Sequence, residues 1–502
     1  MLILDALIVI LAILIGSRKG GATVGFTGGV GLAVLIFVCG LKPTSPPITV
    51  MLIILAVTSL AGILQCSGGL DYLVSIAEKI LRKNPNHVTV LAPLVVLCFV
   101  IFTGTAFIAM ALIPVIAEVS RGANVRPERP LSATCAASAF GIAASPMSAA
   151  TAGMIGILGT QGINFGPMMM VLIPAILIGV LAGSLCVYKR GKELLEDPEY
   201  LRRLKAGEIA PLKAGTNYVP TREAKLAVGI FGSAVALILL LGSFKGLLPH
   251  WTVNGKSIAL STVNLIEVVT LAASALIIFA CKIKPANLTK SSVFNGGVIA
   301  VMVVFGVCFM TDTFFAAHKG ELISLFGDVL RTYPWLFAVV LVLGSAILES
   351  QGATTAALMP LGVALGIDPH YLVAMAPAVC CTWFLPIHPN ILASVAIDST
   401  GTMNVGSWIL NHSTMLPGLV VTVVSVIFGF VFAGIVFRPA TTFFAHCAPA
   451  SFFRGQALSH NGRGECRKSS NTFIAIFSSP RFLPSIWCAR RVVFRRPERR
   501  SE

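Results

Sequence analysis

The feature that most constrains the fold is a long series of apolar segments, each close to the roughly twenty residues that a helix needs to cross a bilayer core. Hydrophobic residues make up 56% of the 502-residue chain and charged residues only 12%, whereas about a quarter of an ordinary globular protein is charged. Apolar spans are predicted at residues 2–15, 22–41, 48–66, 168–188, 226–243, 258–281, 294–311 and 415–437. With the spans that lead into two interrupted stretches, we expect an all-α polytopic membrane protein of about 10–12 transmembrane helices.

The net charge of +16 does not indicate a nucleic-acid partner, because of where the charge lies. Residues 438–502 hold twelve Lys or Arg and three Asp or Glu, and the remaining positive charge is spread over short loops. Cytoplasmic loops of membrane proteins have this character. The 12 cysteines show no CxxC and no Cys/His ligand spacing, so neither a metal site nor a disulfide framework is indicated.

Enzyme motifs are missing where they would be informative. The chain contains no HExxH, no GxSxG and no GxxxxGK[ST] sequence. These motifs mark membrane metalloproteases, serine hydrolases and ATP-driven pumps. We therefore expect a protein that is not an enzyme and that requires no cofactor.

Two apolar stretches are interrupted at what should be membrane depth. Residues 101–153 contain FTGTAF and AASAFGIAASPMSAATAG, and residues 348–398 contain ESQGATT and CCTWFLPIHPNILASVAI. A helix that breaks inside a membrane exposes backbone groups that need a partner, and secondary carriers place their substrate sites at such breaks. We therefore expect two broken helices or re-entrant hairpins that together form the functional site.

The two stretches belong to halves that can be aligned with each other. Residues 73–85 match 322–334, residues 111–115 match 357–361, and residues 136–151 match 379–394. The order of amphipathic helix, span, break and re-entrant stretch is the same in both halves. If each half crosses the membrane an odd number of times, the two repeats are inverted. The predicted organisation is a first repeat at 1–188, a charged cytoplasmic connector at 189–225, a second repeat at 226–437 and an atypical basic tail at 438–502.

Two charged segments are predicted to be amphipathic helices in the membrane interface, at residues 70–84 and 321–334. In the first, apolar residues recur at helical spacing, which is typical of an interfacial helix. Its charged residues are expected on the solvated face. These are Asp71, Glu78, Lys79 and Arg82.

The breaks can bind an anion without a cationic side chain. A half-helix that begins at membrane depth presents free N–H groups and about half a positive charge, so two of them facing one cavity could hold two carboxylates. Packing, or bonding to its own helix, is the alternative role for any single Ser or Thr. The candidate substrate-binding residues are Thr103, Gly104, Thr105, Ser145, Pro146, Ser148, Ser350, Gln351, Gly352, Thr354, Thr355, His388, Pro389 and Asn390.

Glu349 is the candidate residue for coupling transport to an ion. The titratable residues expected at membrane depth are Glu267, Asp312, Glu349 and His388. Buried ionisable groups in membrane spans are usually functional, and Glu349 is the acidic residue that lies at a break.

A set of motifs runs in order through residues 1–437. The motifs are SRKGG, SGGLDYLVSIAEKILRKNPNHVTVLAP, TGTAFIAMALIPVIAEV, VRPERPLSA, GIAASPMSAA, SQGATTAALMP, FLPIHPN and DSTGTMNVGSWILNHSTMLPG. Together they resemble a known family, the anaerobic C4-dicarboxylate transporters or Dcu carriers, with DcuB-like members most similar.

The resemblance implies a multi-pass carrier of the bacterial inner membrane that exchanges fumarate for succinate, and also takes malate and aspartate, during anaerobic respiration. It also implies inverted repeats, two re-entrant hairpins and alternating access. Its expected partners are the dicarboxylates and the lipid bilayer, with a homo-oligomer as a further expectation. The alternatives are an inorganic anion or cation/proton carrier of the same architecture, and a membrane co-regulator of a sensor kinase. The resemblance ends before the tail at 438–502, which is expected to be disordered or the product of a shifted reading frame.

Overall fold

Helices dominate the computed structural model, which describes residues 1–19, 21–209, 219–253, 256–406 and 411–437. This confirms the all-α class. One exception was not predicted: β1 (His250–Val253) and β2 (Lys256–Ala259) form an antiparallel hairpin that pairs His250 with Ala259. The span predicted to begin at residue 258 therefore begins later, because residues 258 and 259 belong to β2. The predicted tail at 438–502 lies outside the described residues.

The described residues of the first half form nine α-helices, and the interrupted stretch at residues 101–153 falls on four of them, α5 to α8. In chain order they are α1 (Leu2–Lys19), α2 (Thr23–Phe37), α3 (Ile48–Cys66), α4 (Gly69–Lys83), α5 (Val88–Thr103), α6 (Phe107–Gly122), α7 (Glu128–Ala143), α8 (Ala149–Leu158) and α9 (Phe165–Cys186).

A short helix in the predicted connector, α10 (Pro198–Lys205), precedes the second half. The remaining helices are α11 (Arg222–Ser243), α12 (Thr262–Ala280), α13 (Ser292–Val303), α14 (Phe309–Thr332), α15 (Leu336–Leu348), α16 (Gln351–Ala364), α17 (Pro369–Met375), α18 (Pro389–Ile397) and α19 (Met415–Val436).

Seven helical segments of the described chain are long and apolar enough to cross a membrane. Three shorter apolar helices accompany them, at Leu2–Gly16, Thr23–Phe37 and Leu336–Leu348. The long segments are Ile48–Cys66, Pro85–Thr103, Phe165–Cys186, Arg222–Ser243, Thr262–Ala280, Ser292–Leu322 and Met415–Val436. These helices confirm a polytopic membrane protein.

The two predicted amphipathic segments differ from expectation in different ways. The first is a separate helix, α4, but Glu78 does not lie on a solvated face: it is 6% exposed and accepts a hydrogen bond from Arg82 at 2.8 Å. Arg82 also donates to Glu118 of α6 at 3.0 Å, so α4 packs by a charged contact as well as an apolar one. The second segment is not separate. It continues α14, and a π-helical turn at Val304–Cys308 joins α14 to α13.

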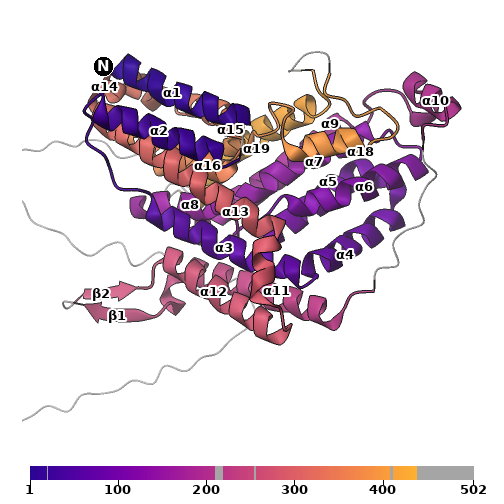
Figure 1. The fold of residues 1–502 in the computed structure, drawn as a ribbon, viewed down its shortest axis with the longest axis horizontal. Helices are drawn as coiled ribbons and strands as arrows, with labels where there is room; N and C mark the ends of the chain where they lie inside the picture. Colours follow the sequence, from indigo (N-terminus) through magenta and orange to yellow (C-terminus); the bar gives the residue numbers. More distant parts are fainter. Residues whose placement is uncertain (20, 210–218, 254–255, 407–410, 438–502) are drawn as a thin grey trace, which may run out of the picture. The chain divides into compact units, whose positions relative to one another are not determined.

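Helices α9 and α19 pack closely against each other, and this contact depends on glycine. A Cβ atom on Gly179 would lie 2.0 Å from Oγ of Ser425, and one on Gly183 would lie 2.4 Å from Cγ2 of Val421. Small residues allow membrane helices to approach this closely. Elsewhere, the first two helices, α1 and α2, pack together with α14 of the second half (Figure 1).

The described residues lie in one compact unit, within which the predicted halves follow the same order of elements. In the first half α5, a break, α6, α7 and α8 precede the long helix α9. In the second, α15, a break, α16, α17 and α18 precede the long helix α19. This order is consistent with two repeats, and both the inverted relation and the limits 1–188, 189–225 and 226–437 stay predictions.

Candidate functional site

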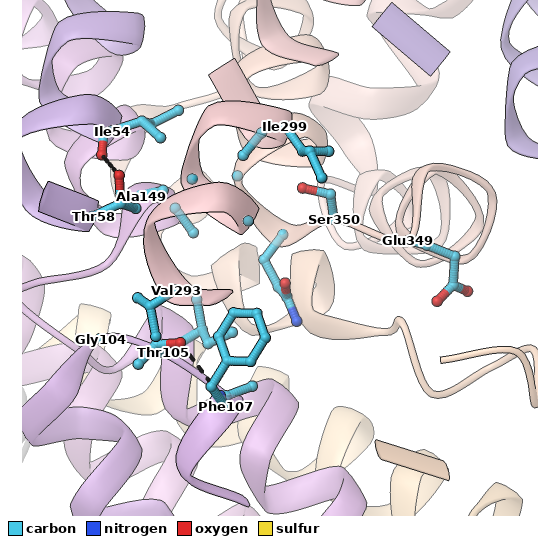
Figure 2. Close-up of a pocket in the computed structure, with 18 of the residues that line it drawn as sticks. Ile54, Thr58, Gly104, Thr105, Phe107, Ala149, Val293, Ile299, Glu349 and Ser350 are labelled. Atoms are coloured by element: carbon cyan, nitrogen blue, oxygen red, sulfur yellow. Dashed lines mark hydrogen bonds between the residues drawn. The ribbon is translucent and has the colours of Figure 1, made fainter. Parts of the chain in front are cut away.

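The two breaks meet at one cavity of about 680 Å³ (Figure 2). Its walls come from the first break, the second break, the N-termini of α8 and α18, and the helices α3 and α13. None of the described residues that line it is Lys or Arg. Both interrupted stretches, which lie far apart in the sequence, therefore contribute to a single space.

In the first break, a glycine allows the chain to turn. α5 ends at Thr103, and Gly104 follows it with a φ of 72° in the left-handed region. A Cβ atom on Gly104 would lie 2.3 Å from the carbonyl oxygen of Met147, so the loop before α8 passes directly against the break. Only glycine combines this backbone conformation with this approach.

In the second break, the same turn is made by a glutamate. α15 ends at Leu348, and Glu349 has a φ of 49° in the left-handed region, which is uncommon for a residue with a side chain. Both of its carboxylate oxygens are buried and have no hydrogen-bond partner among the described residues. In Figure 2 the Glu349 side chain is directed away from Thr105 and Phe107, although the residue belongs to the cavity wall.

Three helices, α8, α16 and α18, begin at or beside the cavity, and each begins with a side chain that caps it. At the start of α18, Nδ1 of His388 accepts from the Asn390 N–H at 3.3 Å. Oγ of Ser148 accepts from the Thr151 N–H at 3.1 Å at the start of α8. Oγ of Ser350 accepts from the Ala353 N–H at 3.3 Å at the start of α16. In each helix the cap satisfies one N–H and leaves the first N–H groups without a partner inside the helix.

The N-termini of α8 and α16 lie next to each other. A Cβ atom on Gly352 would lie 3.4 Å from Cβ of Ala149 and 3.9 Å from the backbone nitrogen of Ala150. Both of these alanines and Gln351 line the cavity. Two positive helix ends therefore converge on one space, which is the arrangement that favours an anion.

Nine of the fourteen predicted substrate-binding residues line the cavity, together with Glu349. They are Thr103, Gly104, Thr105, Ser350, Gln351, Gly352, His388, Pro389 and Asn390. The structure therefore brings these residues together, and their contact with a substrate stays a proposal.

The other five are Ser145, Pro146, Ser148, Thr354 and Thr355, which do not line the cavity. Ser145 donates to the carbonyl of Ile101 at 2.7 Å, Ser148 caps α8, and Thr354 donates to the carbonyl of Ser350 at 2.8 Å. These hydroxyls hold the breaks in shape. Oγ1 of Thr355 is buried with no hydrogen-bond partner in the described chain.

Sequence reasoning did not identify α3 and α13 as walls of the cavity. Ile54, Val57 and Thr58 contribute from α3, and Val293 and Gly296 from α13. Both helices are continuous at these positions, so neither carries the interruption that marked the other stretches. The available signal was the Gly296–Gly297 pair inside an apolar segment.

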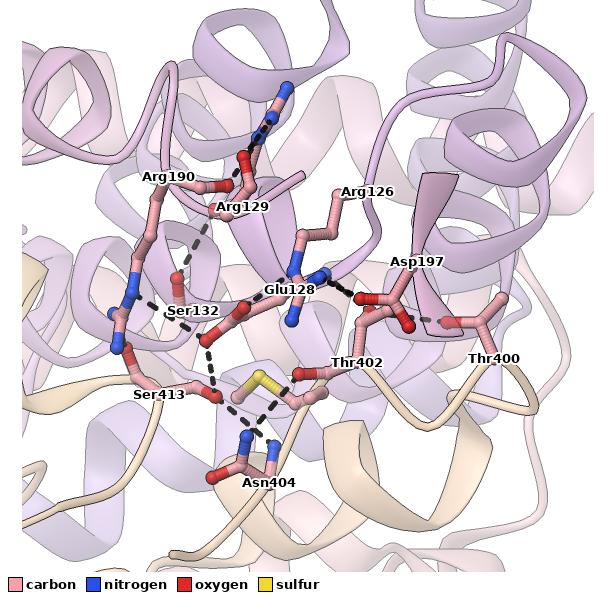
Figure 3. Close-up of polar contacts among 12 residues, drawn as sticks. Arg126, Glu128, Arg129, Ser132, Arg190, Asp197, Thr400, Thr402, Asn404 and Ser413 are labelled. Atoms are coloured by element: carbon pink, nitrogen blue, oxygen red, sulfur yellow. Dashed lines mark hydrogen bonds and ion pairs between the residues drawn. The ribbon is translucent and has the colours of Figure 1, made fainter. Parts of the chain in front are cut away.

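A second polar cluster joins loops from both halves of the chain (Figure 3). Glu128, at the start of α7, pairs with Arg126 at 2.7 Å and with Arg190 of the connector at 3.6 Å. It also accepts from the Ser413 hydroxyl at 2.9 Å, and Arg126 pairs in turn with Asp197. The charges of these loops looked like cytoplasmic loop charges in the sequence, and only the fold shows that they are paired and largely buried.

One further buried pair was also missed. Asp5 of α1 lies 2.8 Å from Nε2 of His318 of α14, and both side chains are almost fully buried. Neither residue lines the cavity. In the part of the chain that the structure describes, no three His, Cys, Asp or Glu residues come together as a metal-binding group.

Comparison with known proteins agrees with this architecture. A family model described as "Anaerobic c4-dicarboxylate membrane transporter" matches residues 1–437. "Anaerobic C4-dicarboxylate transporter DcuB" of Escherichia coli O6:H1 is 38% identical over 440 residues, which cover 86% of this chain and 98% of that protein. "C4-dicarboxylate transporter DcuA" of Helicobacter pylori is 38% identical over 437 residues, covering 86% and 98%.

A solved structure of Neisseria gonorrhoeae MtrF covers 87% of this chain and 95% of its own, at 13% identity and a TM-score of 0.48, a likeness too low to decide the fold. The relatives above are named as transporters and not as enzymes. With the apolar helices, they place the chain among multi-pass proteins of the bacterial inner membrane. The chain belongs to the anaerobic C4-dicarboxylate membrane transporter family.

Proposed function

We propose that this protein exchanges C4-dicarboxylates across the inner membrane, with fumarate and succinate as the principal pair and malate and aspartate as further substrates. The observation that carries this proposal is the meeting of the α8 and α16 N-termini at a cavity whose described walls hold no Lys or Arg. Family membership and the names of the relatives support the same substrate class.

The cavity offers a dicarboxylate two kinds of surface. Each helix N-terminus provides N–H donors and about half a positive charge, and away from bulk water this charge acts strongly. The Thr105 hydroxyl and the amides of Gln351 and Asn390 add neutral polar groups to the wall. Ile54, Val57 and Val293 add apolar surface that suits the two central carbons of a four-carbon acid.

Alternating access is proposed from the same arrangement. A broken helix can change its angle at the break without breaking further hydrogen bonds, and secondary carriers move one repeat against the other around a fixed site. The matched order of elements before α9 and α19 supports two repeats of this kind. The predicted homo-oligomer stays a prediction.

Glu349 is proposed as the residue that couples transport to a proton. A buried carboxylate with no partner is costly when charged and much less so when protonated. Its two oxygens have no partner among the described residues. This observation keeps a proton-linked carrier as the second candidate function.

Purified protein in liposomes tests the exchange. Labelled succinate trapped inside should leave rapidly when fumarate is supplied outside and slowly when it is not. If neither fumarate nor another C4-dicarboxylate drives this efflux, the exchange proposal is wrong, and retention of normal membrane insertion would then favour the regulatory alternative.

The variant that tests the site is Gly352→Val. The added side chain would fill the space between α8 and α16, because a Cβ atom on Gly352 alone would lie 3.4 Å from Cβ of Ala149. We expect the affinity for succinate to fall by about tenfold or more, which corresponds to about 1.4 kcal/mol. Gly229→Ala is the matched control, because a Cβ atom there meets nothing within 4 Å. Equal affinity for succinate in the two variants would show that the N-termini of α8 and α16 do not bind the substrate.

A further inference from the structure

A second cavity, of about 410 Å³, lies beside the cavity formed by the two breaks, and we call them the outer and the central cavity. Its lining includes Gln65, Leu70 and Asp71, together with Ser292 of α13. Asp71 and Ser292 are exposed, so this second cavity opens toward the surface. Among the described residues, Phe107 and Met110 are the two that line both cavities.

Phe107 occupies the boundary because the first break places it there. It is the first residue of α6, and its N–H donates to Oγ1 of Thr105 at 3.3 Å. Its ring rests against α13 at a residue without a side chain: a Cβ atom on Gly296 would lie 3.2 Å from ring atoms Cε2 and Cζ. Figure 2 shows the Phe107 ring among the residues of the central cavity, with the hydrogen bond to Thr105.

Met110 completes the boundary from the next turn of the same helix. Residues three apart on an α-helix lie on the same face, so Phe107 and Met110 present one aromatic ring and one flexible thioether to the same opening. Both side chains are only half-buried. A methionine side chain adapts its shape easily, and a phenylalanine ring packed on bare backbone can swing away without leaving a polar group unsatisfied.

We infer that Phe107 and Met110 form the gate between the central cavity and the outer one, and that the outer cavity is a vestibule on the substrate path. The inference rests on the proposed function for the identity of what passes through. Thr105 links the gate to the site, because the residue lines the central cavity and its Oγ1 accepts a hydrogen bond from the Phe107 N–H. A ligand that binds Thr105 therefore acts on the group that positions the ring.

The gate can be tested without transport. Ala300→Cys places a thiol in the wall of the central cavity, and its reaction with an anionic methanethiosulfonate reagent is followed in detergent by mass spectrometry of the modified peptide. Phe107→Ala should raise the labelling rate by about tenfold, as a barrier lowered by about 1.4 kcal/mol would. Phe107→Trp should lower the rate, and Met110→Ala should raise it.

The matched control is Phe102→Ala, because Phe102 packs on Phe231 with ring centroids 5.3 Å apart and lines neither cavity. Its labelling rate should equal that of the parent. Equal rates in the Phe107→Ala, Phe107→Trp and parent proteins would overturn the gate. Because the alanine and tryptophan variants are expected to change the rate in opposite directions, a general loosening of the fold cannot imitate the result.

A transport readout separates this inference from the proposed function. In liposomes, Phe107→Trp should slow succinate–fumarate exchange while leaving unchanged the thermal stabilisation of the solubilised protein by succinate. Slow exchange with weakened stabilisation would make Phe107 a binding residue and would overturn its role as a gate. If the labelling rate changes in the Phe107 variants but the parent protein exchanges no dicarboxylate, the gate is supported and the proposed substrate is wrong.

Discussion

Glu349 combines a strained backbone conformation with a buried carboxylate. It takes a left-handed conformation with a φ of 49°, where Gly104 serves at the equivalent turn of the other half. A non-glycine residue in this conformation costs about 1–2 kcal/mol, and the buried, unpartnered carboxylate adds a further cost. Strain of this kind clusters at functional sites, and we therefore place the proton-linked step at this side chain.

The neutral variant Glu349→Gln tests this assignment. Its side chain has the same shape, so the protein should insert and fold normally. Exchange of one dicarboxylate for another should persist, whereas net uptake driven by a pH gradient should fall to the level of empty liposomes. Both rates are measured with labelled succinate in the same preparation. Net uptake that still follows the pH gradient in this variant would exclude Glu349 as the coupling residue.

At the scale of elements, the contact between α9 and α19 is decided by glycine and not by hydrophobicity. Both helices are apolar throughout, and lipid tails are as apolar as their side chains, so close packing holds membrane helices together. Gly179 and Gly183 allow α19 to approach the backbone of α9. The same principle brings α13 against α3, where a Cβ atom on Gly297 would lie 2.2 Å from Oγ1 of Thr58.

Replacing Gly179 with valine should therefore destabilise the protein. The new side chain would collide with Ser425, and overpacking of this kind typically costs about 1–3 kcal/mol. The expected result is a lower midpoint of thermal unfolding in detergent. In Gly229→Ala, where nothing lies within 4 Å, the better helix propensity of alanine should leave the midpoint unchanged or raise it. A Gly179→Val protein as stable as the parent would show that α19 can shift freely.

For the whole molecule, the cluster around Glu128 connects segments that the sequence separates widely. It joins the start of α7 to the connector through Arg190, and to the loop before α19 through Ser413. Removing one partner of a buried ion pair strongly destabilises a protein, so the loss of any one member should weaken the whole cluster.

Glu128→Gln should lower the stability of the solubilised protein by about 3–5 kcal/mol, because it leaves Arg190 and one interaction of Arg126 without an opposite charge. Glu208→Gln is the control. Glu208 pairs with Arg202 at 3.2 Å on the surface, where an ion pair contributes about 0–1 kcal/mol. Denaturant-induced unfolding followed by tryptophan fluorescence measures both. Similar losses in the two variants would mean that the Glu128 cluster is no more than a surface network.

Much of the site could be predicted from local patterns. Gly104 and Ser350 stood out because Gly, Ser and Thr interrupt apolar runs, and backbone groups in a membrane must be satisfied wherever a helix stops. The roles of individual hydroxyls could not be predicted in this way. Ser148 and Thr354 carry hydroxyl groups that could bind a substrate, yet both form hydrogen bonds to the backbone at the start of their own helices. Which partner a hydroxyl takes depends on its rotamer and its neighbours.

Hydrophobic length and helix interruption are local properties, so the amino-acid sequence was enough to predict a helical membrane protein with two broken helices. Motifs spread over residues 1–437 were also enough to predict the family. Three features became visible only in the folded chain: the two breaks share one cavity, α3 and α13 wall it, and Phe107 lines both this cavity and an outer one. These depend on contacts between residues far apart in the chain, and no local pattern records which apolar faces will pack together.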